Sequence, residues 1–335
     1  MAYTTIDDSE AYFQVKTYTG TNASTSFTLD GDTDMQPDLV WLKVRSAGSG
    51  QDHTVFDSVR GVQKFIETNT TNAEATGSNY LTAFNSDGFT LGNDQSHVNA
   101  NGDTYVAWCW KESATAGFDM VSFTGNATDD RDINHSLSAV PHFWVTRNRT
   151  DVENWVVYHH KNTSAPETDY LVLDDTNATG DSSGVWSDEA PTSSVYTVGT
   201  ANSVNGNTDA MITYLWTGKQ GFSKFGSYIG NGNADGTFVY TGFKPAWVMV
   251  KNTGATENWI IFDNKRPGYN LTDALLKPNL NNVESTSGVK FDLLSNGFKA
   301  RVSDAEGNSS GGDFIYMAFA EAPFVNSNGV PCNAR

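Results

Sequence analysis

The sequence predicts an all-β protein of three tandem β-sandwich modules, each about 105 residues long, with a jelly-roll or lectin-like topology. Three observations support this. The chain repeats itself with a period near 105 residues. Within each repeat, apolar runs of about four to seven residues alternate with clusters of Gly, Asn, Asp, Ser and Thr. Aromatic residues make up 12% of the chain and charged residues 18%, as in a folded chain that buries ring surface.

A glycine and a proline mark each copy of the repeat. The glycines end Tyr18-Thr-Gly20, Phe123-Thr-Gly125 and Tyr228-Ile-Gly230, and they are 105 residues apart. The prolines Pro37, Pro141 and Pro245 open the runs PDLVWLK, PHFWVTR and PAWVMVK, 104 residues apart. We therefore divide the chain into an N-terminal arm with the first module (1–112), a divergent second module (113–217), a third module (218–322) and a polar C-terminal tail (323–335).

The apolar runs read as strands. LVWLKV, WVVY and VAWCW are too short for typical helices and are rich in residues that fit a pleated surface. The best helix candidate, residues 58–67, contains Gly61 and is expected to form at most a short turn. The joints ESATAG and TGKQG are too short for free tumbling, so neighbouring modules should touch. Ends this polar fray unless something pins them, so order in them would indicate packing against another chain. The strand order stays open.

Copies one and three share a charged loop, FDSVRG and FDNKRPG. The shared residues are Asp57 with Arg60, and Asp263 with Arg266. An ion pair that holds the loop is a simpler interpretation than a reaction site. The second copy has His159 and Asn162 at these places, which argues against an ionic mechanism common to all three. His159 and His160 would point to opposite faces of a strand, so both would rarely bind one metal ion.

The segment 226–243 places Gly230, Gly232 and Gly236 between aromatic runs, as a phosphate-binding loop would. Only Gly230 has counterparts in the other copies. A phosphate loop also needs a following helix N-terminus, whereas the residues from Thr237 to Tyr240 read as a strand. We expect a turn between two strands, with Gly230 in a backbone conformation that side chains resist.

Two further local features have simple interpretations. Asp30-Gly-Asp-Thr-Asp34 has carboxylates spaced like the start of a calcium loop but lacks the later glycine and glutamate, so a solvated turn is favoured. Most tryptophans lie in strand-like runs and are expected in the core. Trp186, in SSGVWSDEAPTSS, is the one expected near the surface. Neither a metal nor a cofactor is expected.

The net charge of the chain disfavours two classes of binding partner. With 39 Asp and Glu against 21 Lys and Arg, the net charge of −18 disfavours nucleic acid and anionic membranes. The start of the chain has no signal-peptide pattern and no apolar run approaches the ~20 residues of a membrane span, which predicts synthesis in a cytoplasm without export. Cys109 and Cys332 are expected to be free thiols. No nucleophile elbow, P-loop or HExxH motif occurs. The chain is not expected to be an enzyme, although glycan hydrolysis by paired carboxylates stays open.

Long stretches resemble a repeat of unknown function in virion proteins of marine tailed bacteriophages such as cyanophages and pelagiphages, where it occurs in tail-fibre-like and other structural proteins. The stretches include PDLVWLKVRSA, FNSDGFTLG, VNANGDTYVAWCWK, FSKFGSYIGNGNADGTFVYTGFKPAWVMVKN and DFIYMAFAEAPF. They cover nearly the whole chain.

The resemblance implies a surface-displayed tail-fibre or capsid decoration component without enzymatic activity or cofactor. The implied partners are other virion proteins and further copies of the chain, and the alternative is a host-receptor or glycan-binding module. Copy two departs from the repeat at PHFWVTRNRT and YHHKNT, so the three modules need not make the same contacts.

Overall fold

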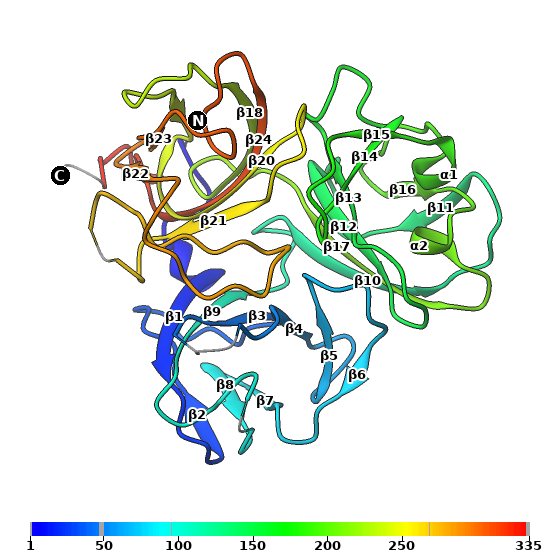
Figure 1. The fold of residues 1–335 in the computed structure, drawn as a ribbon, viewed down its shortest axis with the longest axis horizontal. Helices are drawn as coiled ribbons and strands as arrows, with labels where there is room; N and C mark the ends of the chain where they lie inside the picture. Colours follow the sequence, from blue (N-terminus) through cyan, green and yellow to red (C-terminus); the bar gives the residue numbers. More distant parts are fainter. Residues whose placement is uncertain (1, 47–49, 95, 268, 333–335) are drawn as a thin grey trace.

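The computed structural model describes residues 2–46, 50–94, 96–267 and 269–332. Within these residues the regular structure is almost entirely antiparallel strands, which confirms the all-β class. The strands form three large sheets and three small ones, and Figure 1 shows three lobes around a common centre. We call the lobes unit 1 (residues 13–110), unit 2 (residues 118–216) and unit 3 (residues 223–323), from the first to the last strand of each large sheet. No helix in the described ranges is long and apolar enough to cross a membrane.

Unit 1 pairs a large sheet with a small one. The large sheet has the spatial order β1 (Phe13–Thr19), β9 (Thr104–Trp110), β3 (Leu39–Val44), β4 (Thr54–Asp57), β5 (Lys64–Glu67) and β6 (Ala75–Thr76). The small sheet has the order β2 (Thr25–Phe27), β8 (Gly88–Leu91) and β7 (Leu81–Asn85). The helix candidate at 58–67 is therefore a turn followed by β5, in line with the expectation that no longer helix forms there.

Unit 2 repeats this arrangement with a smaller second sheet. Its large sheet has the order β10 (Phe118–Thr124), β17 (Ala210–Trp216), β12 (Phe143–Asn148), β13 (Val156–His159), β14 (Asp169–Val172) and β15 (Gly180–Asp181). The small sheet holds only β11 (Arg131–Asn134) and β16 (Val195–Val198). Two single-turn helices, α1 (Ser183–Trp186) and α2 (Asn202–Asn205), lie beside it (Figure 1).

The expectation that Trp186 lies near the surface is wrong. Trp186 is only 1% exposed, and its ring lies 5.1 Å from that of Trp144, edge to face. The small sheet of unit 2 has two strands where unit 1 has three, and α1 packs against β16 and contributes Val185 and Trp186 to the core there. The residues around Trp186 are polar because only one side of the short helix faces the core, so the local sequence did not indicate burial.

Unit 3 has the same strand order with fewer regular strands. Its large sheet contains β18 (Ser223–Ile229), β24 (Asp313–Pro323), β20 (Phe243–Asn252) and β21 (Ile260–Asp263). Its small sheet contains β19 (Phe238–Tyr240), β23 (Gly297–Ala300) and β22 (Phe291–Leu294). Isolated bridges from Ile261 to Leu276 and from Leu275 to Ser285 take the places that β5 and β6 occupy in unit 1.

Each large sheet is buried on both faces. In β3, Val40 and Leu42 face the core between the two sheets of unit 1, whereas Trp41 faces the centre of the molecule. Successive side chains of a strand point to opposite faces, so burial of both faces requires apolar residues at consecutive positions. This explains why LVWLKV is a continuous apolar run without polar alternation.

The centre is filled by aromatic side chains from all three units. Trp110 of unit 1 has ring centroids 6.3 Å from Trp216 of unit 2, 5.7 Å from Trp247 of unit 3 and 5.6 Å from Phe319 of unit 3. The three large sheets therefore share one core, in addition to the separate core inside each sandwich.

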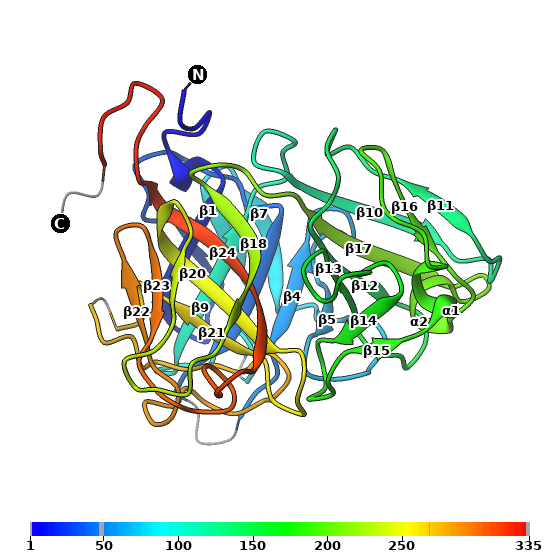
Figure 2. The ribbon, with the colours of Figure 1, turned by 90° about the horizontal axis from the view of Figure 1, so that it is seen from above.

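The N-terminal arm contacts unit 3, and Figure 2 shows the described parts of the arm and of the C-terminal tail on the same side of the molecule. The Tyr3 hydroxyl donates to the carbonyl oxygen of Gly242 at 2.7 Å, and the Asp7 carboxylate accepts from the Ser327 amide at 2.6 Å. The described parts of both ends are thus held by contacts within the chain, so their order does not require a second chain. The last three residues of the predicted tail, 333–335, lie outside the described residues.

Candidate functional site

The signature prolines are buried at strand starts and at a bulge. Pro37 and Pro141 lie two residues before β3 and β12. Pro245 lies inside β20, where the register against β24 shifts on both sides of it. Proline has no N–H to donate to a sheet, which is why it occurs at such places. These three residues shape the sheets and hold no chemistry.

The signature glycines are required by close approach of the backbone. A Cβ at Gly20, Gly125 or Gly230 would lie 2.0 to 2.2 Å from a carbonyl oxygen of the neighbouring loop. None of the three has a left-handed φ, so the prediction of a special backbone conformation at Gly230 is wrong. Glycine is required because the neighbouring backbone leaves no room for a side chain. The following strand is confirmed as β19, which joins the small sheet, so this segment carries the chain from one sheet to the other.

A buried asparagine supports the same loop in each unit, and the sequence analysis missed it. Asn99 donates to the carbonyl oxygens of Ala23 at 2.8 Å and Gly92 at 2.7 Å, and accepts from the Thr21 amide at 2.9 Å. Asn205 and Asn308 do the same in units 2 and 3. The signal was present, because all three follow a small or apolar residue at nearly the repeat period.

The Asp57–Arg60 pair lies at the junction of units 1 and 2. Asp57 and Arg60 form a fully buried ion pair, and the Arg60 backbone amide also donates to Asp57 at 2.7 Å. The hydroxyl of Tyr214, in β17 of unit 2, donates to the same carboxylate at 2.6 Å. The predicted loop pair is therefore confirmed, and its carboxylate also binds the next unit.

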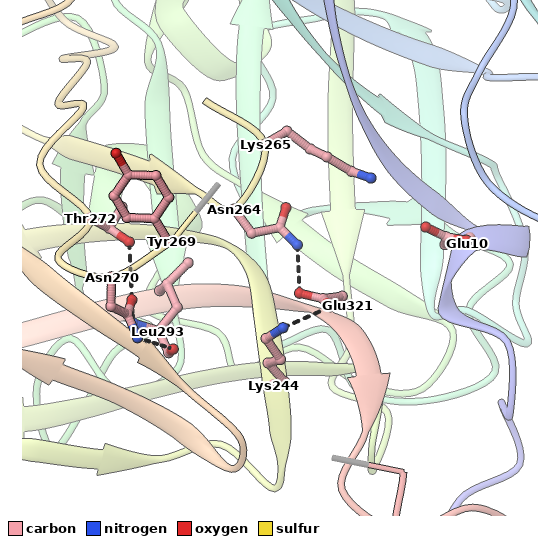
Figure 3. A pocket seen from close by; sticks show the side chains of 9 residues that line it. All are labelled: Glu10, Lys244, Asn264, Lys265, Tyr269, Asn270, Thr272, Leu293 and Glu321. Atoms are coloured by element: carbon pink, nitrogen blue, oxygen red, sulfur yellow. Dashed lines mark hydrogen bonds and ion pairs between the residues drawn. The ribbon is translucent and has the colours of Figure 1, made fainter. Parts of the chain in front are cut away.

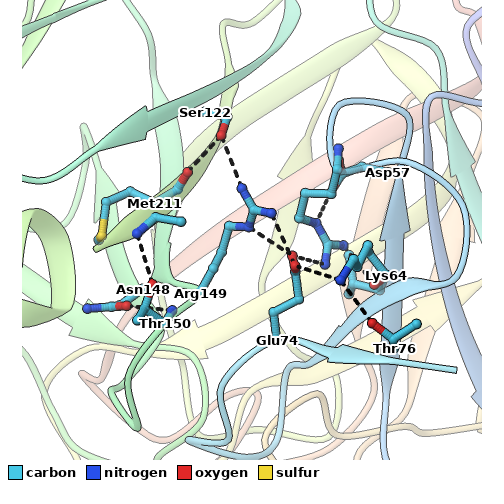
Figure 4. Close-up of polar contacts among 12 residues, drawn as sticks. Asp57, Lys64, Glu74, Thr76, Ser122, Asn148, Arg149, Thr150 and Met211 are labelled. Atoms are coloured by element: carbon cyan, nitrogen blue, oxygen red, sulfur yellow. Dashed lines mark hydrogen bonds and ion pairs between the residues drawn. The ribbon is translucent and has the colours of Figure 1, made fainter. Parts of the chain in front are cut away.

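A second carboxylate, Glu74, completes this junction (Figure 4). Arg149 of unit 2 binds Glu74 through two parallel hydrogen bonds of 2.8 and 3.1 Å, a geometry that strengthens the contact. Arg60 reaches the same carboxylate at 3.4 Å, and Lys64 lies 4.0 Å away. The Glu74 amide donates to the carbonyl oxygen of Arg149 at 2.9 Å.

The junction of units 3 and 1 has the same set of contacts. Asp263 accepts from Arg266 Nε at 2.6 Å and from the Trp108 indole of unit 1 at 2.9 Å. Glu284 accepts two bonds of 2.9 Å from Arg45 of unit 1. Because Trp108 and Tyr214 occupy the same register position in β9 and β17, the two junctions use equivalent donors and acceptors.

The junction of units 2 and 3 lacks these ionic contacts. At the donor position, β24 has Met317, whose side chain has no N–H or O–H. The acceptor position is His159, whose Nε2 lies 3.1 Å from the carbonyl oxygen of Tyr316. The Glu74–Arg149 pair is replaced by Thr179 and Thr253, which keep only the backbone hydrogen bond, at 2.9 Å.

Each unit contacts the other two, so the three units form a closed ring. At every junction a side chain of one unit donates a hydrogen bond to a carbonyl oxygen of the unit before it in the ring. The Trp155 indole of unit 2 donates to the carbonyl oxygen of Glu67 in unit 1 at 2.8 Å, and Trp259 of unit 3 donates to Val172 of unit 2 at 2.8 Å. A buried cation from the end of each third strand also crosses a junction. The cations and their acceptor carbonyls are Lys43 with Asn281, Arg147 with Asn72, and Lys251 with Thr176.

In the divergent copy, His159 is buried and His160 is half-buried. Burial lowers the pKa of His159 to about 3 and that of His160 to about 4. His160 Nε2 lies 2.9 Å from the Phe225 carbonyl, and its ring stacks on His142. In the part of the chain that the structure describes, no three His, Cys, Asp or Glu side chains gather as metal ligands. Asp30 of the calcium-like turn pairs with Lys16, and Cys109 and Cys332 are free thiols.

A hollow of ≈ 470 Å³ opens at the end of unit 3, between the arm and residues 264–265 and 269–272 (Figure 3). Its central carboxylate, Glu321, accepts from Lys244 at 2.8 Å and from Asn264 at 2.7 Å. Both carboxylate oxygens are thus engaged by neighbours. Glu10, from the arm, lines the opposite side of the hollow in Figure 3.

Buried ion pairs at two junctions and uncharged hydrogen bonds at the third therefore help to hold the three units together. A family model described as "Domain of unknown function (DUF7483)" matches residues 8–323. The comparison with curated proteins found no match. The matched span begins in the arm, passes through all three large sheets and ends with the last residue of β24. The chain therefore belongs to the family of the domain of unknown function DUF7483.

Proposed function

We propose that the protein is a structural component of a bacteriophage particle, displayed on the capsid or tail and acting by non-covalent assembly. The resemblance of its repeat to virion proteins supports this proposal. The structural observation that carries it is the use of the charged residues that recur in the repeat: Asp57 and Asp263 each accept a hydrogen bond from another unit. Arg60 and Arg266 hold these two carboxylates in place within their own units. Residues that are buried in such contacts have a structural role.

Assembly then depends on the outer surface of the ring. The strands β1, β10 and β18 lie at the edges of their large sheets, with one side unpaired by another strand of the same sheet. Such edges and the surrounding loops can bind other virion proteins or further copies of the chain. Many copies on one particle would multiply weak individual contacts into firm attachment.

The test is location in the particle. Virions of the encoding phage, purified on a density gradient, are analysed by mass spectrometry and cryo-EM, with the major capsid protein as the internal standard. We expect the chain in the particle at a fixed ratio to that standard. Its presence in infected cells and absence from purified particles would overturn the proposal.

A second candidate function is binding of a host-surface glycan. One observation favours it: two aromatic rings, Phe238 and Tyr240, are about half exposed on the outer surface of unit 3. Neighbouring aromatic side chains that stay exposed on a folded surface can mark a binding site.

A further inference from the structure

The outer face of β19 carries two exposed aromatic rings. Along this strand Val239 is buried in the core of unit 3, whereas Phe238 is 45% exposed and Tyr240 is 48% exposed. Alternate residues of a strand share a face, so both rings lie on the outer face, about 7 Å apart from the rise per residue. They form a short aromatic platform.

The platform is specific to unit 3. The strands β2 and β11 occupy the place of β19 in the other units, with Phe27 paired to Phe89 and Ile133 paired to Tyr196 as Val239 is to Phe298. The outward positions are Ser26 and Thr28 in unit 1 and Asp132 and Asn134 in unit 2. Because polar side chains suffice in two units, the fold does not require rings in the third.

Both rings are held in place. The Tyr240 hydroxyl lies 3.3 Å from that of Tyr3 in the N-terminal arm, and the Lys224 ammonium lies 5.4 Å from the centre of the Tyr240 ring. The Phe238 ring lies over Gly297 of the adjacent strand, where even a Cβ would come within 3.1 Å of it. A platform fixed before binding loses less conformational entropy when a ligand arrives.

A hollow of ≈ 360 Å³ lies beside the platform, between β18 and β19. Two lysines line it, Lys224 from β18 and the exposed Lys161 from unit 2. The lysines that form ion pairs in the described structure are Lys16, Lys64, Lys244, Lys277 and Lys299, so neither lining ammonium is neutralised by a carboxylate. On a chain of net charge −18 this is a local excess of positive charge.

We propose that this site binds an acidic saccharide. The apolar face of a pyranose ring would lie on Phe238 and Tyr240, and a carboxylate or sulfate of the same chain would meet Lys161 and Lys224. Rings bind the apolar face of an amphipathic ligand, and ammonium groups bind anions through charge-assisted hydrogen bonds. Two lysines on an acidic protein are too few for a nucleic acid, which requires many phosphate contacts.

This inference rests on the second candidate function, glycan binding, and is independent of where the chain sits in a particle. The experiment uses the isolated full chain and three probes: an alginate oligosaccharide with carboxylates, a carrageenan oligosaccharide with sulfates, and uncharged dextran. Calorimetric titration should give binding to at least one acidic probe and not to dextran. The two acidic probes separate carboxylate from sulfate recognition.

Variants locate the site. Phe238→Ala and Tyr240→Ala should each weaken binding about tenfold, the usual effect of removing a central aromatic anchor. Lys161→Ala should weaken binding and reduce its dependence on salt, because one charge contact is lost. The matched controls are Ser26→Ala on β2, Thr28→Ala directly after β2, and Lys265→Ala at the turn position of unit 3 that corresponds to Lys161. All three should bind like the unaltered chain, and melting temperatures confirm that each variant folds.

The outcomes separate the claims. Absence of binding to every probe would overturn both the site and the glycan-binding function. Equal binding of dextran would leave glycan binding standing and overturn acidic recognition. Binding that survives Phe238→Ala and Tyr240→Ala would place the ligand elsewhere. Release of reducing ends from a probe would show catalysis and contradict a purely binding role. None of these results bears on location in a virion, which the particle analysis decides.

Discussion

The junction between units 2 and 3 differs from the other two at several places at once. Where junctions 1–2 and 3–1 have a tyrosine or tryptophan donor facing a buried aspartate, junction 2–3 has Met317 and His159. Where they have a glutamate facing an arginine, it has two threonines. The substitutions occur together because a buried carboxylate that lost its donor and its arginine would cost several kcal/mol.

This comparison explains why the second copy of the repeat diverges. The donor position of this junction is Met317, which donates no hydrogen bond, so an aspartate in place of His159 would gain nothing there. His159 instead accepts from the Lys161 amide through Nδ1 at 3.0 Å, which leaves the Nε2 proton for the Tyr316 carbonyl. The junction thus keeps hydrogen bonds, including that from the Lys251 ammonium to the Thr176 carbonyl, in place of the carboxylate–arginine contacts of the other two.

The largest expected effect is at the ionic junctions. Asp57→Ala or Asp263→Ala should lower the free energy of unfolding by about 3–5 kcal/mol, because each leaves a buried arginine without its carboxylate. His159→Ala should lower it by about 2 kcal/mol, since only neutral hydrogen bonds and some packing are lost. Urea unfolding followed by tryptophan fluorescence measures all three. Equal losses would mean that the junctions do not differ in kind.

Placing the aspartate of the ionic junctions at position 159 tests the difference between the junctions further. His159→Asp alone should cost about 2–4 kcal/mol, because the buried carboxylate has neither an arginine nor an indole or phenol donor. Adding Asn162→Arg and Met317→Tyr should restore at least about 1 kcal/mol of that loss, as contacting residues couple. The control is the double variant without His159→Asp. Additive losses in the triple variant would show that the three positions are independent.

The glutamate pairs come next. Glu74→Gln and Glu284→Gln should each lower the free energy of unfolding by about 1–2 kcal/mol, because a paired, charge-assisted contact becomes neutral. Thr179→Val, at the equivalent place of junction 2–3, should stay within about 0.5 kcal/mol of the unaltered chain. The same urea titrations report the difference. A loss at Thr179 as large as at Glu74 would contradict the assignment.

The smallest effect is a dependence on pH at the joint of units 1 and 2. Burial, and then a hydrogen bond with Asp119, raises the pKa of Glu112 from 4.5 to about 7. The folded state therefore holds a proton that the unfolded state has released, so stability declines as the pH rises from 4.5 to 7 and is level above that. Since Glu112 is half-exposed, the decline is about 1 kcal/mol. Glu112→Gln should remove it. At the equivalent position of the joint between units 2 and 3 the chain has Gly218. Gly218→Ala therefore serves as the control, and its stability should still decline over this pH range.

Local features were predictable from the sequence because they depend on neighbours along the chain. The strand runs, the turn at 58–63 and the Asp–Arg loop pairs all follow from residues within a few positions of one another. The module boundaries remain a prediction. Burial of Trp186 was not predictable, because it depends on the missing third strand of a small sheet.

The candidate sites depend on contacts between distant residues. Trp108 and Asp263 are 155 residues apart, and nothing in either local sequence indicates that they meet. Similarly, the run from Thr237 to Tyr240 predicts a strand but not which residues face outward, since alternation shows the exposed face only when the partner sheet is known. The lysines of the hollow come from different units, so their proximity is a result of the fold alone.

Closure of the ring also sets an order of events in time. Unit 1 leaves the ribosome long before Asp263, and its Trp108 indole has no acceptor until unit 3 has been made. The arm likewise has to wait for Gly242 and Ser327. Contacts of such large sequence separation form slowly and expose apolar surface meanwhile. The nascent chain therefore carries an open aromatic face until its last strand, β24, is synthesised, and helper chaperones or rapid translation of this final stretch would benefit its yield.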